Sequence, residues 1–152
     1  MTRSAALVLF FLFAASICGF GQTVPAKPAL QWAASEGLEQ IVSLLIEQGV
    51  KVDGVDWFGN TALHAAIRYP RVVELLLEGG ASVNARNAFG NTPLHLAVAD
   101  HRVVDILLAA GADVNARNYL DKTALDYAMR GGRSAYNLSI VETLIRAGAG
   151  TP

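Results

Sequence analysis

The sequence predicts an all-α fold, a solenoid of about four stacked helix-turn-helix units with projecting hairpin-like turns. A five-residue motif recurs every 31 residues, at 60–64, 91–95 and 122–126, and its first copy reads Asn-Thr-Ala-Leu-His. A cluster of Val, Ile and Leu follows each copy, and two of these clusters run into the segment Gly-Ala-x-Val-Asn-Ala. Self-similarity at a fixed period of this length is typical of repeat architectures, in which neighbouring units bury a common core.

The first helix of each motif-bearing unit is expected to begin at a threonine: Thr61, Thr92 or Thr123. A threonine hydroxyl at this position can accept a hydrogen bond from a backbone N–H that the helix leaves unpaired. The following apolar cluster predicts a second helix. Pro70 suits its first position in one unit, and Asp100 suits the N-cap in the next.

Gly80 and Gly111 come three residues after the ends of two of the apolar clusters. Glycine tolerates the left-handed conformation that closes many helices, so the second helices are expected to end there. The chain then passes through Val-Asn-Ala-Arg-Asn to Gly90 or Asp121, a composition that predicts a tight hairpin-like turn. One unit is therefore two helices and a projecting turn.

The two outer units depart from this pattern. The upstream unit keeps the second half of the pattern at 41–53, but its beginning at 29–34 lacks the threonine and the histidine. Such degradation is expected of a terminal repeat, whose outer face meets water. In the last unit the stretch 130–139 is longer than its counterparts, so we expect a wider loop between its helices. We predict a repeat domain over 29–149, with units at about 29–55, 56–86, 87–117 and 118–149 and a tail at 150–152.

These motifs resemble the ankyrin-repeat family over about residues 29–149, through the Thr-x-Leu-His start, the double-valine and leucine cluster, and the Gly-Ala-x-Val-Asn-Ala ending. The central copies are shorter than the family's repeat of about 33 residues, and the loss falls between the helices. The resemblance implies a non-catalytic module that binds a partner protein through its turn tips and concave helix face. It also implies that His64 and His95 are structural partners of Thr61 and Thr92.

The turns carry large apolar residues where a turn is ordinarily polar. Together with the exposed helix face they give the candidate partner-binding residues Trp57, Phe58, Arg68, Tyr69, Phe89, Asp100, Tyr119 and Leu120. Aromatic residues and arginine dominate the binding energy of many protein interfaces. In the alternative interpretation, the turn aromatics pack on neighbouring turns and stiffen the row. Trp32 and Tyr127 fall at a helix position expected to face the interior.

The N-terminus has the anatomy of a secretory signal peptide at 1–21, followed by a short linker at 22–28. A basic start precedes an unbroken apolar run at 5–15, which is shorter than the roughly 20 apolar residues needed to span a bilayer. Cleavage after Gly21 and cleavage after Cys18 both fit. We therefore expect a secreted or periplasmic protein with no membrane contact in its mature form. The alternative is a membrane-anchored scaffolding protein that retains this segment as a helix.

Composition and motifs give no support for nucleic-acid binding, metal binding or catalysis. Loss of Arg3 with the predicted signal segment leaves 11 basic and 13 acidic residues, so there is no basic excess to attract nucleic acid. His101 and Asp105 are spaced to share a helix face, but a structural zinc site takes four ligands and the mature chain has no cysteine. The sequence contains no nucleophile motif and no glycine-rich phosphate loop, so we expect neither an enzyme nor a cofactor.

Overall fold

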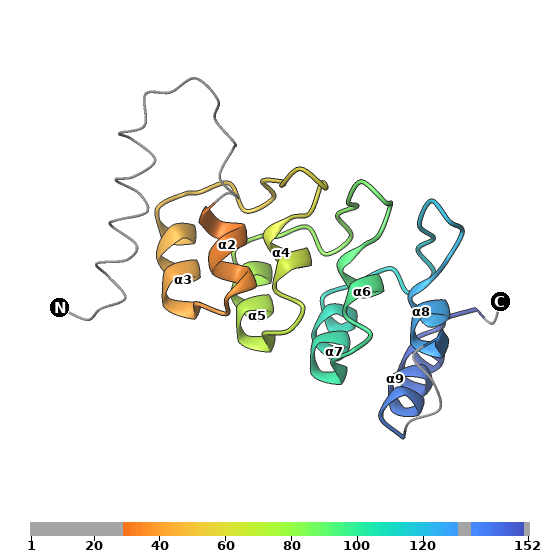
Figure 1. The fold of residues 1–152 in the computed structure, drawn as a ribbon. Helices are drawn as coiled ribbons and strands as arrows, with labels where there is room; N and C mark the ends of the chain where they lie inside the picture. Colours follow the sequence, from red (N-terminus) through yellow and green to blue (C-terminus); the bar gives the residue numbers. More distant parts are fainter. Residues whose placement is uncertain (1–28, 131–134, 151–152) are drawn as a thin grey trace.

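The computed structural model describes residues 29–130 and 135–150, which form eight helices arranged as four pairs. Figure 1 shows the pairs side by side in a row, with the turns between successive pairs projecting from the same side. The described residues contain helices and no strand, so the predicted all-α solenoid is confirmed. The predicted signal peptide at 1–21 and linker at 22–28 lie outside the described residues.

The helices form two layers. The first helices of the pairs are α2 (Ala29–Ser35), α4 (Ala62–Ala65), α6 (Pro93–Leu96) and α8 (Ala124–Arg130). The second helices are α3 (Glu39–Glu47), α5 (Pro70–Glu78), α7 (His101–Ala109) and α9 (Ala135–Arg146). Helices α3, α5, α7 and α9 pack on one another in succession, as do α2 on α4 and α6 on α8. Helices this short are marginal in water by themselves, so contacts between units supply most of their stability.

The core runs along the whole row between the two layers. Leu63, Leu94 and Leu125 occupy the same position in successive first helices, and all three are buried. Leu76 and Leu107 are buried at matching positions of successive second helices. Burying one such side chain contributes about 1.5–3 kcal/mol, and the repeat pattern supplies several in every unit.

The helix boundaries in the central units follow the local signals of the sequence. Pro70 is the first residue of α5, and the Asp100 carboxylate caps α7 by accepting the N–H of Arg102 at 3.0 Å. Gly80 and Gly111 follow α5 and α7 with a φ of 86° each. This left-handed conformation is the one that the glycine signal predicts. The predicted starts and ends of these second helices are confirmed.

The expected wide loop over 130–139 is wrong in its extent. Helix α8 continues to Arg130, and α9 begins at Ala135. Residues 131–134, which separate these helices, lie outside the described residues. The extra chain of this unit therefore lengthens the helices, because α8 has seven residues where α4 and α6 have four, and α9 has twelve where α5 and α7 have nine.

The interior position expected for Trp32 is also wrong, because 38% of this residue is exposed. Helix α2 is the first described element, so it has a described neighbouring unit on one side only. Tyr127 is half-buried, and its ring meets the His95 ring edge to face at a centroid distance of 6.0 Å. The same helix position is therefore covered in the last unit and open in the first.

Among residues 29–130 and 135–150, no helix has the length and apolar character needed to cross a membrane.

Candidate protein-binding surface

Each projecting turn is held by one side-chain oxygen at its start. Oδ1 of Asp56 accepts hydrogen bonds from the N–H groups of Phe58 at 2.8 Å and Asn60 at 2.9 Å. Asn87 and Asn118 repeat this arrangement, each accepting from the residues two and four positions later at 2.9–3.0 Å. Asp and Asn favour turns because their side chains reach the backbone two residues further on. The local sequence therefore determines the shape of each turn.

Successive turns bond to each other through their backbones. The N–H of Ala88 donates to the carbonyl of Phe58 at 2.7 Å, and the N–H of Tyr119 donates to the carbonyl of Phe89 at 3.1 Å. Gly90 closes the second of these turns with a φ of 74°, and a Cβ atom there would lie 2.9 Å from the backbone nitrogen of Tyr119. Glycine can adopt this positive φ, and its lack of a Cβ atom lets the backbone of Tyr119 approach closely.

Asparagine amides connect the bases of the same turns. Nδ2 of Asn87 donates to Oδ1 of Asn60 at 2.9 Å, and Nδ2 of Asn118 donates to Oδ1 of Asn91 at 2.7 Å. Asn87, Asn91 and Asn118 are buried, so these bonds offset the cost of removing their amides from water. The three turns therefore form a connected row.

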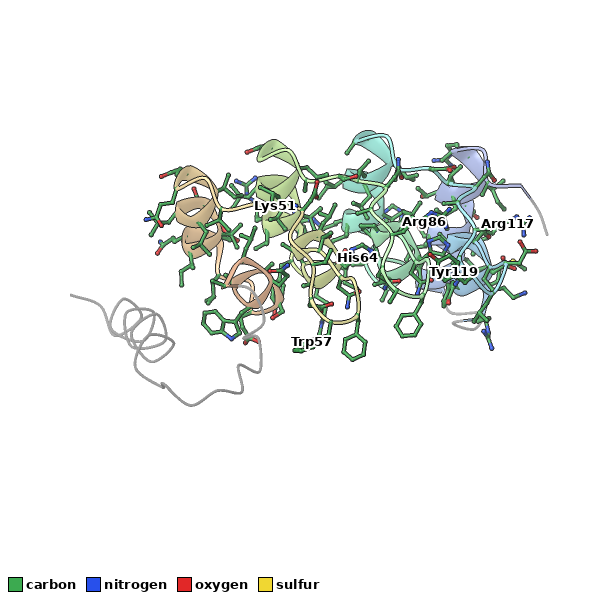
Figure 2. The ribbon with its side chains drawn as sticks, turned by 90° about the horizontal axis from the view of Figure 1, so that it is seen from above. Lys51, Trp57, His64, Arg86, Arg117 and Tyr119 are labelled. Atoms are coloured by element: carbon green, nitrogen blue, oxygen red, sulfur yellow. The ribbon has the colours of Figure 1, made fainter. Side chains whose placement is uncertain are left out.

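The large apolar side chains of the turns point outward from this connected backbone. The turn row consists of Trp57, Phe58, Phe89, Tyr119 and Leu120, whose exposed fractions lie between 57% and 74%. Figure 2 looks down on the turns and shows Trp57 at the edge of the molecule. The backbones of the turns stack on each other, while most of the surface of these side chains remains exposed to solvent. The turns are thus stiffened mainly by backbone and amide contacts.

The three predicted residues of the helix face have different environments. Arg68 is exposed in the turn between α4 and α5. Tyr69 is half-buried against the preceding unit, since a Cβ atom at Gly37 would lie 2.5 Å from its ring. Asp100 is engaged in capping α7. Arg68 is therefore the one of the three that is presented mainly to solvent.

Two arginines that the sequence interpretation did not single out hold the turns, Arg86 between two successive turns and Arg117 within its own turn. A guanidinium nitrogen of Arg86 donates to the carbonyl of Arg117 at 2.8 Å, one unit further on. The guanidinium of Arg117 donates to the carbonyl of Asp121 at 3.0 Å and lies 3.3 Å from its carboxylate. Figure 2 shows the two arginines on successive turns. Their recurrence 31 residues apart within Asn-Ala-Arg-Asn was the available signal.

The histidines of the repeat motif connect each first helix to the next unit. The N–H of Thr61 donates to Nδ1 of His64 at 3.2 Å, and the Thr61 hydroxyl lies 2.9 Å from the same nitrogen. Because Nδ1 accepts the backbone N–H, Nε2 carries the ring hydrogen and donates to the carbonyl of Asn91 at 3.0 Å. Thr92 and His95 repeat these contacts, with Nε2 bonding the carbonyl of the residue at 122.

Burial lowers the pKa of His64 and of His95, against the opposing effect of the carbonyl that each ring contacts in the next unit. Both residues are buried, so the neutral ring is favoured. A neutral ring is also what the hydrogen bonds require, because a protonated Nδ1 could not accept the threonine N–H.

Asp126 takes the histidine position in the last unit. Its Oδ2 accepts the N–H of Thr123 at 2.8 Å and the Thr123 hydroxyl at 3.0 Å. The N–H bond from Thr123 is the main reason that the pKa of Asp126 lies below its ordinary value. A carboxylate can only accept, so Asp126 keeps the bond to the helix start and has no donor for a further carbonyl.

No group of three or more His, Cys, Asp or Glu residues in the described part of the chain is placed to hold a metal ion.

Short helix pairs joined by histidine and asparagine bonds, with a row of outward side chains on their turns, define a helical-repeat scaffold. The family model for ankyrin repeats (three copies) matches residues 4–87 and 68–151, and the chain belongs to the ankyrin-repeat family. No curated protein matches the chain significantly. Ankyrin repeats are generally protein–protein interaction modules and are typically not enzymes.

Proposed function

We propose that this chain is an exported ankyrin module that binds a partner protein through the turn row and the adjoining concave face of the first helices. The observation that carries the proposal is the exposure of Trp57, Phe58, Phe89, Tyr119 and Leu120 on consecutive bonded turns. Contiguous exposed apolar surface of this kind is characteristic of interaction sites. Arg68, an exposed residue between α4 and α5, adds a residue type that is frequent at binding hot spots.

Rigid presentation favours binding by this row. The turns are connected by backbone bonds of 2.7 and 3.1 Å and by buried amide bonds, so little conformational entropy is left to lose on binding. Side-chain and loop ordering is a substantial cost of association, and a preorganised surface avoids part of it. The turn row therefore combines apolar area with low mobility of its supporting backbone.

A pull-down after crosslinking tests this surface. The natural chain is compared with a variant carrying Trp57→Ala, Phe58→Ala, Phe89→Ala and Tyr119→Ala. A control variant carries Leu44→Ala and Ile145→Ala, which remove exposed apolar side chains from the second-helix layer. Circular dichroism first establishes equal folding of all three proteins. We expect one protein to be captured by the natural chain and the control and lost from the turn variant, whereas equal capture by all three would contradict the proposed surface.

Export rests on the sequence of the first 21 residues, and periplasmic or extracellular location is part of the same proposal. Mass spectrometry of the protein from the exported fraction of its source cells measures the mature N-terminus. Cleavage after Gly21 or Cys18 is expected. An intact N-terminus in the membrane fraction would instead support the anchored scaffolding alternative.

A further inference from the structure

A groove on the side of the molecule opposite the first-helix layer lies between α7 and α9. It has a volume of about 580 Å³, and its lining includes His101, Asp105, Thr143 and Arg146. Helix α7 supplies the first two of these residues, and α9 supplies the other two. The groove is thus separate from the turn row and has a different chemistry.

Three side chains in this groove form a hydroxyl–imidazole–carboxylate arrangement. Nδ1 of His101 lies 3.0 Å from Oδ2 of Asp105, one helical turn along α7. Nε2 of the same ring lies 3.1 Å from the hydroxyl oxygen of Thr143 on α9. Both distances are short enough for a hydrogen bond. The Thr143 contact has the geometry of a nucleophile with its general base, and the Asp105 contact has the geometry of that base with the group that orients it.

The carboxylate determines which nitrogen of the neutral ring is the base. An ionised Asp105 can only accept, so the ring hydrogen lies on Nδ1 and donates to Oδ2. Nε2 of His101 is then an acceptor, and the Thr143 hydroxyl is the donor. This is the proton arrangement that a general base needs before a hydroxyl attacks a carbonyl carbon.

The repeat pattern does not require this arrangement. The unit before that of His101 has Pro70 of α5 at the matching position. The unit before that of Thr143 has Ile106 of α7 at the matching position. The corresponding groove between α3 and α5 holds Ser43, whose hydroxyl donates to Glu47 at 3.2 Å without an imidazole. The α7–α9 groove therefore carries a base that the equivalent groove lacks.

We propose that the α7–α9 groove is an acyl-transfer site for small uncharged carboxylic esters, with Thr143 as nucleophile and His101 as general base. Attack of the Thr143 oxygen on the ester carbonyl forms the new C–O bond, and the hydroxyl proton passes to Nε2. The bond to the leaving alkoxide breaks as Nε2 returns that proton to it. Nε2 then takes a proton from a water molecule as the water oxygen attacks the acyl carbonyl, and the bond from the acyl carbon to the Thr143 oxygen breaks as Nε2 returns the proton to that oxygen. This restores the Thr143 hydroxyl and releases the carboxylic acid.

The remaining lining of the groove indicates the substrate class. Arg146 follows Thr143 by three residues on α9, so its guanidinium is available on the same side to stabilise the oxyanion. Asp105 and Glu142 also border the groove, and their carboxylates disfavour an anionic substrate. Leu108 contributes an apolar wall, which suits a short acyl or aryl group.

Acetylation by p-nitrophenyl acetate tests the proposal on the full-length chain, with p-nitrophenolate release and peptide mass mapping as the two readouts. We expect acetyl-Thr143 to form and turn over. His101→Gln is expected to slow the release by about 100-fold or more, since a positioned base contributes at least that factor. Thr143→Val is expected to abolish the release, while Thr143→Ser retains it. Unfolding measurements on each variant show whether the helix pair is intact.

Ser139 in the same groove and Ser43 in the α3–α5 groove are internal controls, because both are hydroxyl side chains that line a groove of this layer, and Ser43 donates to the Glu47 carboxylate. Acetylation confined to Thr143 and dependent on His101 supports the site. Acetylation of Ser139 or Ser43 at the same rate, no acetyl-Thr143, or an unchanged rate in a folded His101→Gln variant would each overturn it. If the bond between His101 and Thr143 were purely structural, Thr143→Val would change the stability of the chain, and the natural chain would not become acetylated at Thr143.

Discussion

Nε2 of His64 lies 3.0 Å from the backbone carbonyl of Asn91, so the start of one helix pair is bonded to the turn that leads into the next. The same ring accepts the N–H of Thr61 through Nδ1. One side chain therefore supports both the local helix start and the contact between units. Loss of the His64 side chain therefore removes a hydrogen bond at the start of α4 and a hydrogen bond to the next unit.

His64→Ala should destabilise the chain more than Asp126→Ala. Both variants lose the bond to the threonine N–H, but only His64→Ala also leaves the Asn91 carbonyl without its ring partner. The Asn91 carbonyl still accepts the N–H of Asn87 at 3.0 Å, so the additional loss is one hydrogen bond, and we expect a difference of about 0.5–1.5 kcal/mol in the free energy of unfolding. Urea titration of both variants measures it. Equal losses would show that the contact between units contributes nothing measurable.

The free energy of unfolding should fall as the pH is lowered from about 7.5 to 5. Burial lowers the pKa of His64 and His95 in the folded chain, so below about 6.5 the unfolded chain binds protons that the folded chain does not. Stability is therefore complete above the unfolded pKa and is lost progressively as the pH approaches the folded pKa. Urea titrations across this range measure the slope.

A variant with His64→Gln and His95→Gln is the control for this pH dependence. It is less stable at every pH, but its slope between about pH 7.5 and 5 should be smaller, because the two buried titrating rings are gone. At lower pH the depressed pKa of Asp126 adds a further loss in both proteins, present below its ordinary pKa of about 3.9. An unchanged slope in the double variant would contradict the assignment.

Gly90→Ala should cost more stability than Gly80→Ala. Both glycines have positive φ, so alanine pays about 1–2 kcal/mol for the left-handed conformation at either position. At Gly80 the added Cβ meets no atom within 4 Å, whereas at Gly90 it lies 2.9 Å from the Tyr119 nitrogen. We expect Gly90→Ala to show the larger loss in a urea titration. Similar losses would mean that the stacked turns can move apart freely.

The first unit should be stabilised by restoring its missing pair. Gln31 occupies the histidine position, and its amide nitrogen donates to the carbonyl of Gly54, while Oε1 is buried with no partner among the described residues. Pro28 stands at the threonine position and has no N–H to donate. Pro28→Thr with Gln31→His is expected to add about 1–2 kcal/mol to the free energy of unfolding, by supplying the cap.

The matching controls are the two single substitutions. Neither supplies both the N–H donor and the ring acceptor, so most of the gain should occur only in the double variant. A double-mutant cycle from urea titrations measures this coupling. A coupling energy near zero would show that the unit does not need the pair.

The central units could be predicted from local signals, because each of their boundaries depends on one residue and its immediate neighbours. Pro70 has the φ that the first residue of a helix needs, and the Asp100 carboxylate accepts N–H groups at the start of α7. Gly80 and Gly111 adopt the left-handed conformation that follows the ends of α5 and α7. The threonine and histidine pairing was implied by family resemblance, while the carbonyl that each ring contacts is visible only in the structure.

Features that depend on chain segments far apart were not predictable in the same way. His101 and Thr143 are 42 residues apart, and the longer last unit shifts the 31-residue register between them. The exposure of Trp32 depends on which units flank α2, which its own sequence does not encode. The assignment of Tyr69 to the binding face likewise overlooked its contact with Gly37 in the preceding unit.

The bonds from His64 and His95 end on backbone carbonyls, which every residue possesses. A unit consequently places almost no demand on the side-chain identity of its successor at these contacts. Tandem duplication of a segment such as 87–117 would give each histidine a suitable acceptor and would add one more turn to the exposed row. The architecture can thus gain length through a single genetic event, and the recognition surface grows in step with the core.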